Sequence, residues 1–226
     1  MATLKTVILI PALNEAETIS DVVSGVREYG TPLVVSDGST DDTAGAARAA
    51  GAEVLELPIN RGYEGALDAG FAKAAELDAE IVITFDADGQ FNPKLLGDIQ
   101  SEIAATGVSL VFGVRPTYAR IGECLFGYYT RIRYGVRDIL CGVKAYPIAL
   151  YLEHGQFDGG RSVGTELALA ALRRGDRFVT IPAEVRPRQD DKPRFGSGWR
   201  GNKRILIALL DAVVLDLRHI FGKLAL

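Results

Sequence analysis

The segment Ile81-Val82-Ile83-Thr84-Phe85-Asp86-Ala87-Asp88-Gly89-Gln90 places a nearly uninterrupted apolar run directly before two carboxylates. A short apolar run without polar alternation is typical of a strand that helices cover on both faces. Similar runs occur at residues 6–11 and 33–36. In open α/β sheets the ligand binds beyond the carboxyl ends of such strands, so the polar residues that follow them are candidate site residues.

Strands and helices are predicted to alternate through the first half of the chain. The expected strands lie at residues 6–11, 33–36, 53–57, 81–85 and 109–113, and the expected helices at 15–29, 41–50, 62–77 and 93–105. Short strands joined by helices of about ten or more residues form right-handed crossovers in a mostly parallel sheet. The sequence therefore predicts an α/β, doubly wound, Rossmann-like fold with helices on both faces of the sheet.

The regular alternation ends after Gly113. Beyond an Arg-, Tyr- and Gly-rich stretch at 115–137, only a helix at 165–174 and a strand at 178–184 are predicted. No linker is long enough to separate two domains, so we predict a single domain.

A basic segment precedes the C-terminus. Residues 186–204 hold seven Lys or Arg against two Asp, and a final amphipathic helix is predicted to begin near Asn202. We therefore divide the chain into a body at residues 1–185 and a basic segment with a C-terminal helix at residues 186–226.

The net charge of −4 conceals an uneven distribution. Residues 1–114 carry 6 Lys or Arg and 18 Asp or Glu, whereas residues 115–226 carry 19 and 11. Such asymmetry indicates two surfaces, one suited to cations and one to anions.

Composition excludes several classes of protein. The apolar content of 48% with 24% charged residues excludes a disordered chain, and two cysteines with two histidines exclude a disulfide framework and a His-rich metal site. No signal peptide precedes the first strand, and the late apolar stretch at 205–217 is shorter than the roughly 20 residues of a spanning helix. We expect a cytoplasmic protein that attaches to a membrane surface.

Three polar clusters follow predicted strands, at residues 11–15, 36–42 and 86–90. In the third cluster, Asp86 and Asp88 lie close together at the sheet edge. Two neighbouring carboxylates repel each other unless a cation lies between them, and Mg²⁺ takes one or two carboxylates together with substrate phosphates. The alternative is that both residues cap the helix that starts near Pro93. The position after a buried strand, beside two other polar strand ends, favours the metal.

The second cluster combines two functions. Asp41 and Asp42 precede an Ala-rich helix, where capping is the favoured interpretation. Asp37 ends a buried strand and is placed to accept a hydrogen bond from a nucleobase. The glycine-bearing segment 60–65 opens a helix whose N-terminus favours anions. Neither a Walker loop nor a G-x-G-x-x-G motif is present, which argues against ATPase and dinucleotide-binding functions.

Taken in order, five motifs resemble those of family 2 glycosyltransferases. They are IPALNE at 10–15, VSDGSTD at 35–41, NRG at 60–62, DADGQ at 86–90 and DILCGVK at 138–144. The set is most similar to the polyprenol-phosphate (dolichol-phosphate) mannose or glucose synthase branch. This resemblance implies a GT-A fold, with residues 1–114 as a nucleotide-sugar half and 115–185 as an acceptor half. The chain departs from the usual pattern at Ala12, Ser36 and Gly89, and the first two departures leave the base and the sugar open.

The resemblance also implies roles for individual residues. The nucleotide-sugar would be bound by Pro11, Leu13, Glu15, Asp37, Arg61, Gly62 and Asp86. Mg²⁺ or Mn²⁺ would be held by Asp86, Asp88 and Gln90. Catalytic roles are expected for Asp88, Glu166 and Arg188. Glu166 is either a general base or a residue that orients a basic partner.

The resemblance further implies an inverting transfer of a hexose from a GDP- or UDP-sugar to polyprenyl phosphate, at the cytoplasmic face of a membrane. The acceptor phosphate would meet Arg115, Arg131, Arg186, Arg188, Arg194, Lys203 and Arg204. The neighbouring aromatic residues would suit a peripheral membrane contact; they are Phe126, Tyr128, Tyr129, Phe195 and Trp199. Two alternatives stay open: transfer to a hydroxyl of a glycan or small molecule, and a non-catalytic nucleotide-sugar-binding module. Nucleic acid is not expected as a partner, because the acidic half would repel a polyanion.

Overall fold

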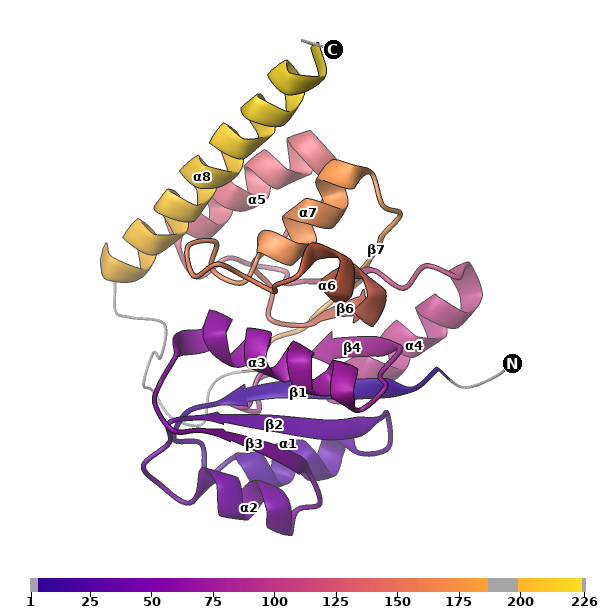
Figure 1. The fold of residues 1–226 in the computed structure, drawn as a ribbon, viewed down its shortest axis with the longest axis vertical. Coiled ribbons are helices and arrows are strands. Elements are labelled where there is room, and N and C mark those ends of the chain that lie inside the picture. Colours follow the sequence, from indigo (N-terminus) through magenta and orange to yellow (C-terminus); the bar gives the residue numbers. More distant parts are fainter. Residues whose placement is uncertain (1–3, 187–198, 225–226) are drawn as a thin grey trace.

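A seven-stranded mixed sheet forms the centre of the protein, in the order β3-β2-β1-β4-β6-β5-β7 (Figure 1). The computed structural model describes residues 4–186 and 199–224. The strands are β1 (Thr6–Ala12), β2 (Thr31–Asp37), β3 (Glu53–Leu57), β4 (Ile81–Thr84), β5 (Val111–Val114), β6 (Lys144–Pro147) and β7 (Val179–Pro182). All neighbours pair in parallel except β6, which runs antiparallel to both β4 and β5.

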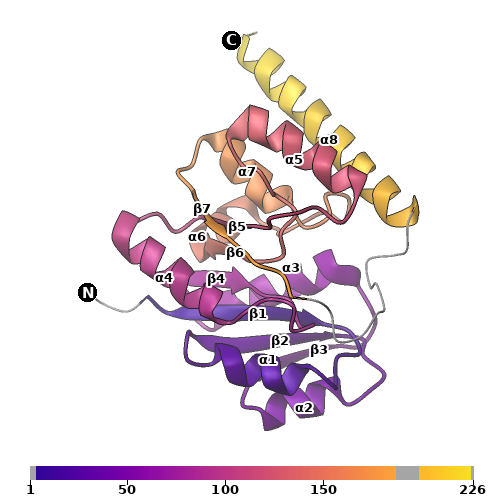
Figure 2. The same ribbon diagram turned by 180° about the vertical axis from the view of Figure 1, so that it is seen from behind.

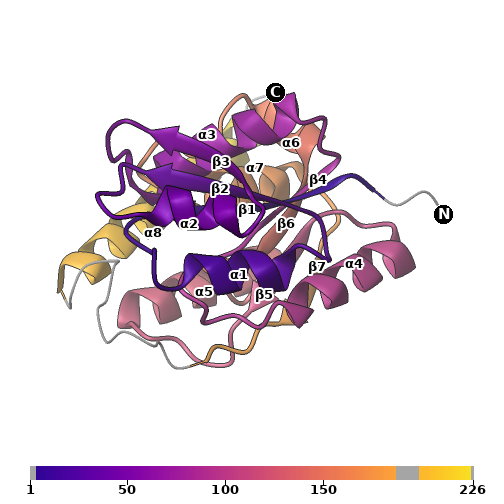
Figure 3. The same cartoon turned by 90° about the horizontal axis from the view of Figure 1, so that it is seen from below.

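Helices cover both faces of the sheet, as predicted (Figure 3). One core cluster packs the sheet against α1 (Ile19–Val26), α2 (Thr43–Ala49) and α4 (Lys94–Thr106). The other packs it against α3 (Gly62–Glu76), α5 (Ile121–Tyr134), α6 (Ile148–His154), α7 (Glu166–Arg174) and α8 (Trp199–Leu224). The central strands are buried on both sides, which explains why their sequences lack polar alternation.

The first half of the chain follows the predicted alternation closely. The strand β3 has the expected bounds, and α3 ends one residue before the expected position. The helix α1 is shorter than expected, because residues 15–18 form a turn in which the Glu15 carbonyl accepts the N–H groups of Thr18 and Ile19. The mostly parallel α/β sheet is confirmed.

The second half contains elements that the sequence did not predict. Helix α5 replaces the irregular stretch expected at 115–137, and the pair β6–α6 occupies residues 144–154. The strand β6 is short and enters the sheet in the antiparallel direction between β4 and β5. Its four residues are too few to produce a periodic signal of their own.

Helices α5 and α8 pack side by side over the second half of the sheet (Figures 1 and 2). Asp216 of α8 is 2% exposed and joins three neighbours, accepting hydrogen bonds from Tyr129 of α5 and Arg173 of α7, with Arg133 at 3.9 Å. This buried carboxylate anchors the long C-terminal helix to the body of the protein. Among the described residues, no helix is long and apolar enough to cross a membrane.

Candidate functional site

A cleft of about 470 Å³ opens at the carboxyl ends of β1, β2 and β4. Its walls combine the three polar loops with side chains from α3, the start of α5 and the first turns of α8. The residues predicted for the nucleotide-sugar or the metal that line it are Pro11, Leu13, Glu15, Asp37, Gly62, Asp86, Asp88 and Gln90. The sheet therefore brings together residues that lie as far as 79 positions apart in the chain.

The loop after β1 is fixed to the loop after β2. Asn14 adopts a left-handed φ of 53°, and its side-chain oxygen accepts the backbone N–H of Thr40 at 2.8 Å. The next residue, Glu15, is 7% exposed, and its backbone N–H donates to the Thr43 hydroxyl at 2.8 Å. These bonds hold the Glu15 carboxylate at the cleft, where Thr18 donates to it at 3.0 Å.

The predicted base-reading residue, Asp37, is 4% exposed at the end of β2. Its Oδ1 accepts the backbone N–H of Arg61 at 2.7 Å. Arg61 does not line the cleft with its side chain; it contributes through its main chain. Gly38 allows the two loops to approach, because a Cβ there would lie 2.5 Å from the nitrogen of Asn60. The loop at 60–62 is thereby tied to the end of β2.

Asp86 and Asp88 follow β4 and both line the cleft. A Cβ added to Gly142 would lie 2.3 Å from Oδ2 of Asp86, so the glycine of the DILCGVK motif leaves the space that this carboxylate occupies. Oδ1 of Asp88 accepts the backbone N–H of Gln90 at 3.1 Å. Within the described residues there is no group of three or more Asp, Glu, His or Cys side chains around one point. Two oxygen donors without sulfur or imidazole fit a hard divalent ion that completes its shell with phosphates.

The side chain of Gln90 has a structural contact as well. Its Nε2 donates to the carbonyl of Arg186 at 3.1 Å, and the Arg186 N–H donates back to the Gln90 carbonyl at 2.9 Å. Phe91 and Val185 form an antiparallel bridge beside these bonds. The loop at residues 86–90 carries the predicted metal ligands, and we call it the metal loop for that prediction. It is attached to the start of the basic segment, which connects the two halves of the sequence at the cleft.

Asp41, expected to cap a helix, links two loops. It accepts the backbone N–H groups of Ala16 at 3.2 Å and Thr43 at 3.1 Å, and the Thr43 hydroxyl as well. Burial would raise the pKa of Asp41, but these hydrogen bonds outweigh it and hold the pKa below its ordinary value. Asp42 takes the N-cap position of α2 without a side-chain cap bond.

Arg115 follows β5 and lines the cleft in a tightly paired state. Its Nε and NH2 donate to the two oxygens of Asp138 at 2.7 and 2.9 Å, and Glu123 lies at 3.3 Å. Burial would lower the pKa of Arg115, but the hydrogen bonds and charge of the nearly inaccessible Asp138 raise it above its ordinary value. Arg115 is one of the predicted phosphate-binding residues. It is held by Glu123 and Asp138, two carboxylates from the same second half of the chain.

Two further arginines line the cleft. Arg204, a predicted acceptor residue on α8, donates to the buried Glu64 of α3 at 2.8 Å. Arg120, which the sequence did not single out, donates to Glu123 at 3.0 Å. Arg115, Arg120 and Arg204 therefore each contact a carboxylate, and all three line the same cleft as Asp86 and Asp88.

Other predicted residues lie outside the lining of the cleft. Arg131 is exposed on α5 and Lys203 is exposed on α8. Arg186 contacts the metal loop through its main chain, and its exposed side chain is not part of the lining. Arg188 and Arg194 fall outside the described residues.

Glu166 begins α7 and does not line the cleft. Its carboxylate accepts the side-chain amide of Gln156 and the backbone N–H of Gly159, both at 2.7 Å, and His154 Nε2 lies 3.3 Å away. Burial would raise the pKa of Glu166, but these partners lower it. A lowered pKa makes a weaker base. Its role as a base stays a prediction.

Val163 and the buried Lys144 are two groups near the cleft that sequence reasoning missed. Val163 lines the cleft with a φ of 54°, an unusual conformation for a β-branched residue. Lys144 of β6 is 5% exposed and donates to the carbonyl of Gly164 at 3.0 Å. Burial lowers the pKa of Lys144 to about 8. The quoted DILCGVK motif contained Lys144, but nothing in the sequence indicated that it points into the core.

Tyr63 is a second lining residue that was not predicted. Burial, and then the charge of Asp86, raise the pKa of its hydroxyl well above the ordinary value. The phenol therefore stays neutral and can donate a hydrogen bond inside the cleft. The sequence did indicate its location, because Tyr63 directly follows Gly62 of the NRG motif, where α3 starts.

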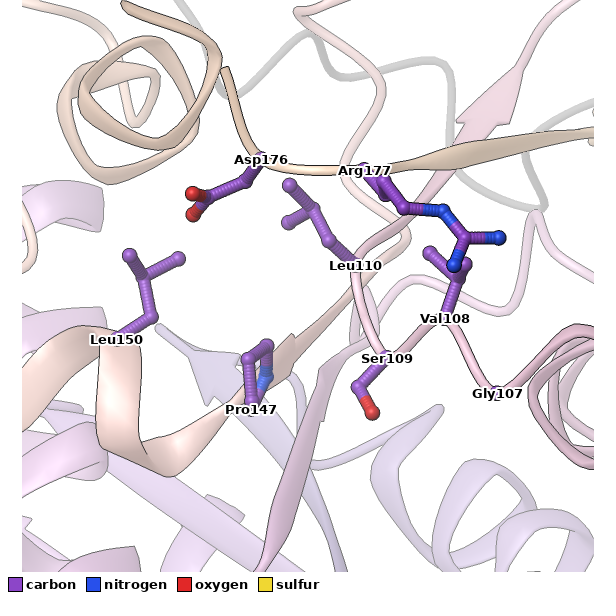
Figure 4. A pocket seen from close by; sticks show the side chains of 8 residues that line it. All are labelled: Gly107, Val108, Ser109, Leu110, Pro147, Leu150, Asp176 and Arg177. Atoms are coloured by element: carbon purple, nitrogen blue, oxygen red, sulfur yellow. The ribbon is translucent and has the colours of Figure 1, made fainter. Parts of the chain in front are cut away.

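A second hollow of about 350 Å³ lies at the opposite end of the sheet (Figure 4). It is lined by Gly107–Leu110, Pro147, Leu150, Asp176 and Arg177. These residues precede β5 and β7 or end the antiparallel β6, so the hollow is remote from the polar loops. Asp176 pairs with Arg174, and the site contains no group of carboxylates that would suggest metal chemistry.

Comparison with protein families gives one match that covers more than half of the chain. The family model described as glycosyl transferase family 2 matches residues 7–134. A glycosyltransferase of Mycobacterium tuberculosis, described as uncharacterized, is 33% identical over 218 residues, which cover 90% of this chain and 94% of that protein. The undecaprenyl-phosphate mannosyltransferase of Micrococcus luteus is 27% identical over 217 residues, or 85% of this chain and 88% of that protein.

A solved structure shares the fold. Glucosyl-3-phosphoglycerate synthase from Mycobacterium tuberculosis, crystallised with Mn²⁺, UDP-glucose and phosphoglyceric acid, superimposes with a TM-score of 0.74 at 23% identity. The match covers 92% of this chain and 79% of that one. At this level of identity the likeness concerns the arrangement of helices and strands.

Proposed function

The chain belongs to glycosyl transferase family 2, and from this premise we propose that it moves a hexose from a GDP- or UDP-linked sugar to polyprenyl phosphate at the cytoplasmic face of a membrane. The enzyme class and the GT-A fold agree with the sequence prediction. The observation that carries the proposal is the cleft itself. The cleft is lined by three carboxylates, Asp37, Asp86 and Asp88, which we call the acidic wall, and by three arginines, Arg115, Arg120 and Arg204, which we call the basic or arginine wall.

The donor would bind across the ends of β1, β2 and β4. Asp37 has an oxygen bonded to the Arg61 N–H and faces the cleft, where it would accept a hydrogen bond from the base. Asp86 and Asp88 would hold Mg²⁺ or Mn²⁺. The ion, when bound, would neutralise the diphosphate leaving group. The glycosyltransferase structure described above, solved with Mn²⁺ and UDP-glucose, supports this assignment.

A phosphate acceptor fits the carboxylates of the cleft, because each one among the described lining residues is either assigned to the donor or the metal or is paired with arginine. A phosphate monoester has a second pKa of about 6 and attacks as an anion, so it needs no group to remove a proton. Among the lining residues, Glu123 is paired with Arg115 and Arg120, and Glu166 lies outside the cleft. The three arginines would orient the acceptor phosphate against the sugar. The undecaprenyl-phosphate mannosyltransferase relative supports this acceptor class.

The second candidate is transfer to a hydroxyl of a small phosphorylated acid. The structural likeness to glucosyl-3-phosphoglycerate synthase favours this candidate, because that enzyme was solved with phosphoglyceric acid. A hydroxyl acceptor requires a general base, and we assign that role to Glu166 in this alternative only. The two candidates share the donor site and differ in the acceptor and in the need for a general base.

A donor and acceptor screen tests the proposal. Purified protein is incubated with radiolabelled GDP-mannose, GDP-glucose, UDP-glucose or UDP-N-acetylglucosamine, with Mg²⁺, Mn²⁺ or EDTA. The acceptors are a short polyprenyl phosphate, phosphoglyceric acid and free sugars. We expect metal-dependent label in the polyprenyl phosphate product alone. Label in phosphoglyceric acid would establish the second candidate, and donor binding without transfer to any acceptor would leave a binding module.

A further inference from the structure

Helix α5 exposes a row of large apolar side chains. Ile121, Leu125, Tyr128 and Ile132 are each between 47% and 77% exposed. Their spacing of four, three and four residues places them on one side of the helix. The opposite side carries Glu123, Phe126 and Thr130, which are buried in the body of the protein. Isolated exposed apolar residues need no explanation, but a continuous row along about three helical turns does.

Helix α8 has a second row of the same kind. Ile207, Leu210, Val214 and Leu217 are each between 38% and 63% exposed, with spacings of three, four and three residues. The side that faces the protein carries Ile205, Ala208, Ala212 and Asp216, all 2% exposed. Helices α5 and α8 pack against each other (Figure 2), with Gly122 beside Asn202 and Tyr129 beside Asp216. Each row points away from the buried side of its helix, so we assign the two rows to one outer surface. We call these eight residues the two-helix face.

The acidic and the basic side chains of α5 and α8 differ in their partners. The carboxylates of α5 and α8 are Glu123, Asp211 and Asp216. Glu123 pairs with Arg115 and Arg120, Asp211 with Arg161 at 3.0 Å, and Asp216 with Arg173. Each carboxylate is thus neutralised by an arginine from outside these two helices.

Three basic side chains of the same helices are placed differently, whereas Arg133 and Arg204 are ion-paired. Arg131, Lys203 and Arg218 are exposed, and within the described part of the chain no carboxylate forms an ion pair with them. The surface around the two-helix face therefore combines apolar rows with positive charge that these residues do not share with a carboxylate. This combination matches a lipid surface with anionic headgroups, in which apolar side chains enter the acyl boundary and cations meet the headgroup phosphates.

Both helices begin at the cleft. Arg120 directly precedes α5, and Arg204 and Ile205 of α8 line the cleft. The first turns are joined by a hydrogen bond from the Gly122 N–H to the Asn202 side chain at 3.0 Å. A bilayer against the two-helix face would therefore reach the arginine wall of the cleft at one end.

We propose that the two-helix face docks the protein on the surface of an anionic lipid bilayer. The inference rests on the proposed function only in that the acceptor phosphate would be presented at this surface. A second copy of the chain fits less well, because pairing two such faces would bring their arginines and lysines together without the carboxylates to neutralise them. In this contact the two-helix face lies at the boundary between the lipid headgroups and the acyl chains.

Flotation with lipid vesicles tests the docking. The full chain is mixed with vesicles of phosphatidylcholine alone or with 30% phosphatidylglycerol, at low and at high salt. The variants are Leu125→Glu, Leu210→Glu and Tyr128→Ser. The matched control is Leu152→Glu, which changes an apolar residue of α6 that is 61% exposed and lies outside the two-helix face. Sedimentation velocity records the oligomeric state of each protein.

We expect the wild type and Leu152→Glu to float with the anionic vesicles and to bind the neutral ones less. Leu125→Glu and Leu210→Glu should bind at least about tenfold more weakly, and Tyr128→Ser several-fold more weakly. The proposal is overturned if the wild type does not bind anionic vesicles, or if all variants bind equally. It is also overturned if the substitutions dissociate a dimer without changing vesicle binding. No sugar donor is needed, so a protein that floats but fails to glycosylate polyprenyl phosphate would refute the proposed function and leave the docking face standing.

Discussion

The two walls of the cleft are built by different means. On the acidic wall, backbone groups place the carboxylates: the Arg61 N–H holds Asp37, the Gln90 N–H holds Asp88, and the missing side chain of Gly142 makes room for Asp86. These residues lie at strand ends, where the sheet fixes the main chain. The geometry of this wall is therefore a property of the backbone.

On the basic wall, side chains hold other side chains. Arg115 is bidentate to Asp138, Arg120 contacts Glu123, and Arg204 contacts Glu64. Ion pairs thus neutralise part of the excess positive charge in the second half of the sequence. The difference teaches that the net charge of a segment does not measure its capacity to bind an anion. It also predicts that substitutions on the acidic wall mainly affect activity, whereas substitutions behind the basic wall mainly affect stability.

The largest effect is expected from Asp88→Ala. Loss of a metal-holding carboxylate should lower metal-dependent sugar transfer about a thousandfold or more, on the order of 4 kcal/mol in the barrier. EDTA should reduce the wild type to a similar rate. The bond that this side chain accepts from the Gln90 N–H lies in a loop and not in the core, so the melting temperature should stay within a few degrees. Asp98→Ala, an exposed position on α4, is the control. Normal turnover by the Asp88 variant would remove the metal assignment.

Asp138→Asn should instead lower stability. Its carboxylate is 1% exposed and holds both nitrogens of the Arg115 fork. Removing one partner of a buried ion pair costs about 3 to 5 kcal/mol, because the remaining charge is left uncompensated. Urea unfolding gives the value. Glu56→Gln, which breaks the exposed pair with Arg48, should cost less than about 1 kcal/mol. Equal costs for the two variants would contradict the contrast between the walls.

Gly142→Ala tests the space reserved for a carboxylate. The added Cβ would lie 2.3 Å from Asp86 and should displace its carboxylate, with an expected loss of about a hundredfold in turnover. Gly45→Ala is a matched control, since its Cβ would lie 2.1 Å from a carboxylate oxygen of Asp42. Asp42 is exposed and outside the cleft, so its side chain can rotate away. Similar activity in both variants would show that Asp86 is not held for catalysis.

The acidic wall was more predictable from sequence than the basic wall, because its carboxylates lie at strand ends and are placed by the backbone. Strand ends such as Asp37 and Asp86 are marked by a change from apolar to polar residues, and parallel topology brings strand ends to one edge. The resemblance to family 2 glycosyltransferases added the order of the motifs. Helices such as α3 could be predicted to within one residue because their start signals and periodicity are local.

The remaining features depend on tertiary packing. The pairing of Arg115 with Asp138 and the contact of Arg204 with Glu64 join residues 23 and 140 positions apart. Helix α5 was missed because Arg and Tyr mask its apolar periodicity, although its buried positions follow helical spacing. Lys144 was missed as a buried group since lysines are mostly exposed.

The burial of Lys144 should make the free energy of unfolding depend on pH. Burial lowers its pKa to about 8 from the ordinary 10.5, so the folded state releases the proton first as pH rises. The unfolded state then binds more protons between these values, and stability rises with pH in this window. Relative to Lys144→Met, the wild type should gain about 2 kcal/mol in unfolding free energy between pH 7 and pH 10. Urea unfolding at several pH values measures the difference, and a constant difference would mean that Lys144 is not desolvated.

The smallest effect is expected from Arg204→Gln, and it separates the two functions of the basic wall. The Arg204 side chain is 52% exposed and the Glu64 side chain 6%, so solvent screens the pair in part, and its loss should cost less stability than loss of the buried Arg115–Asp138 pair. If Arg204 also meets the acceptor phosphate, the KM for polyprenyl phosphate should rise about tenfold while the KM for the sugar nucleotide stays unchanged. Arg48→Gln, a surface substitution remote from the cleft, should change neither KM. A rise in the donor KM alone would assign Arg204 to the diphosphate, and the basic wall would then serve the donor.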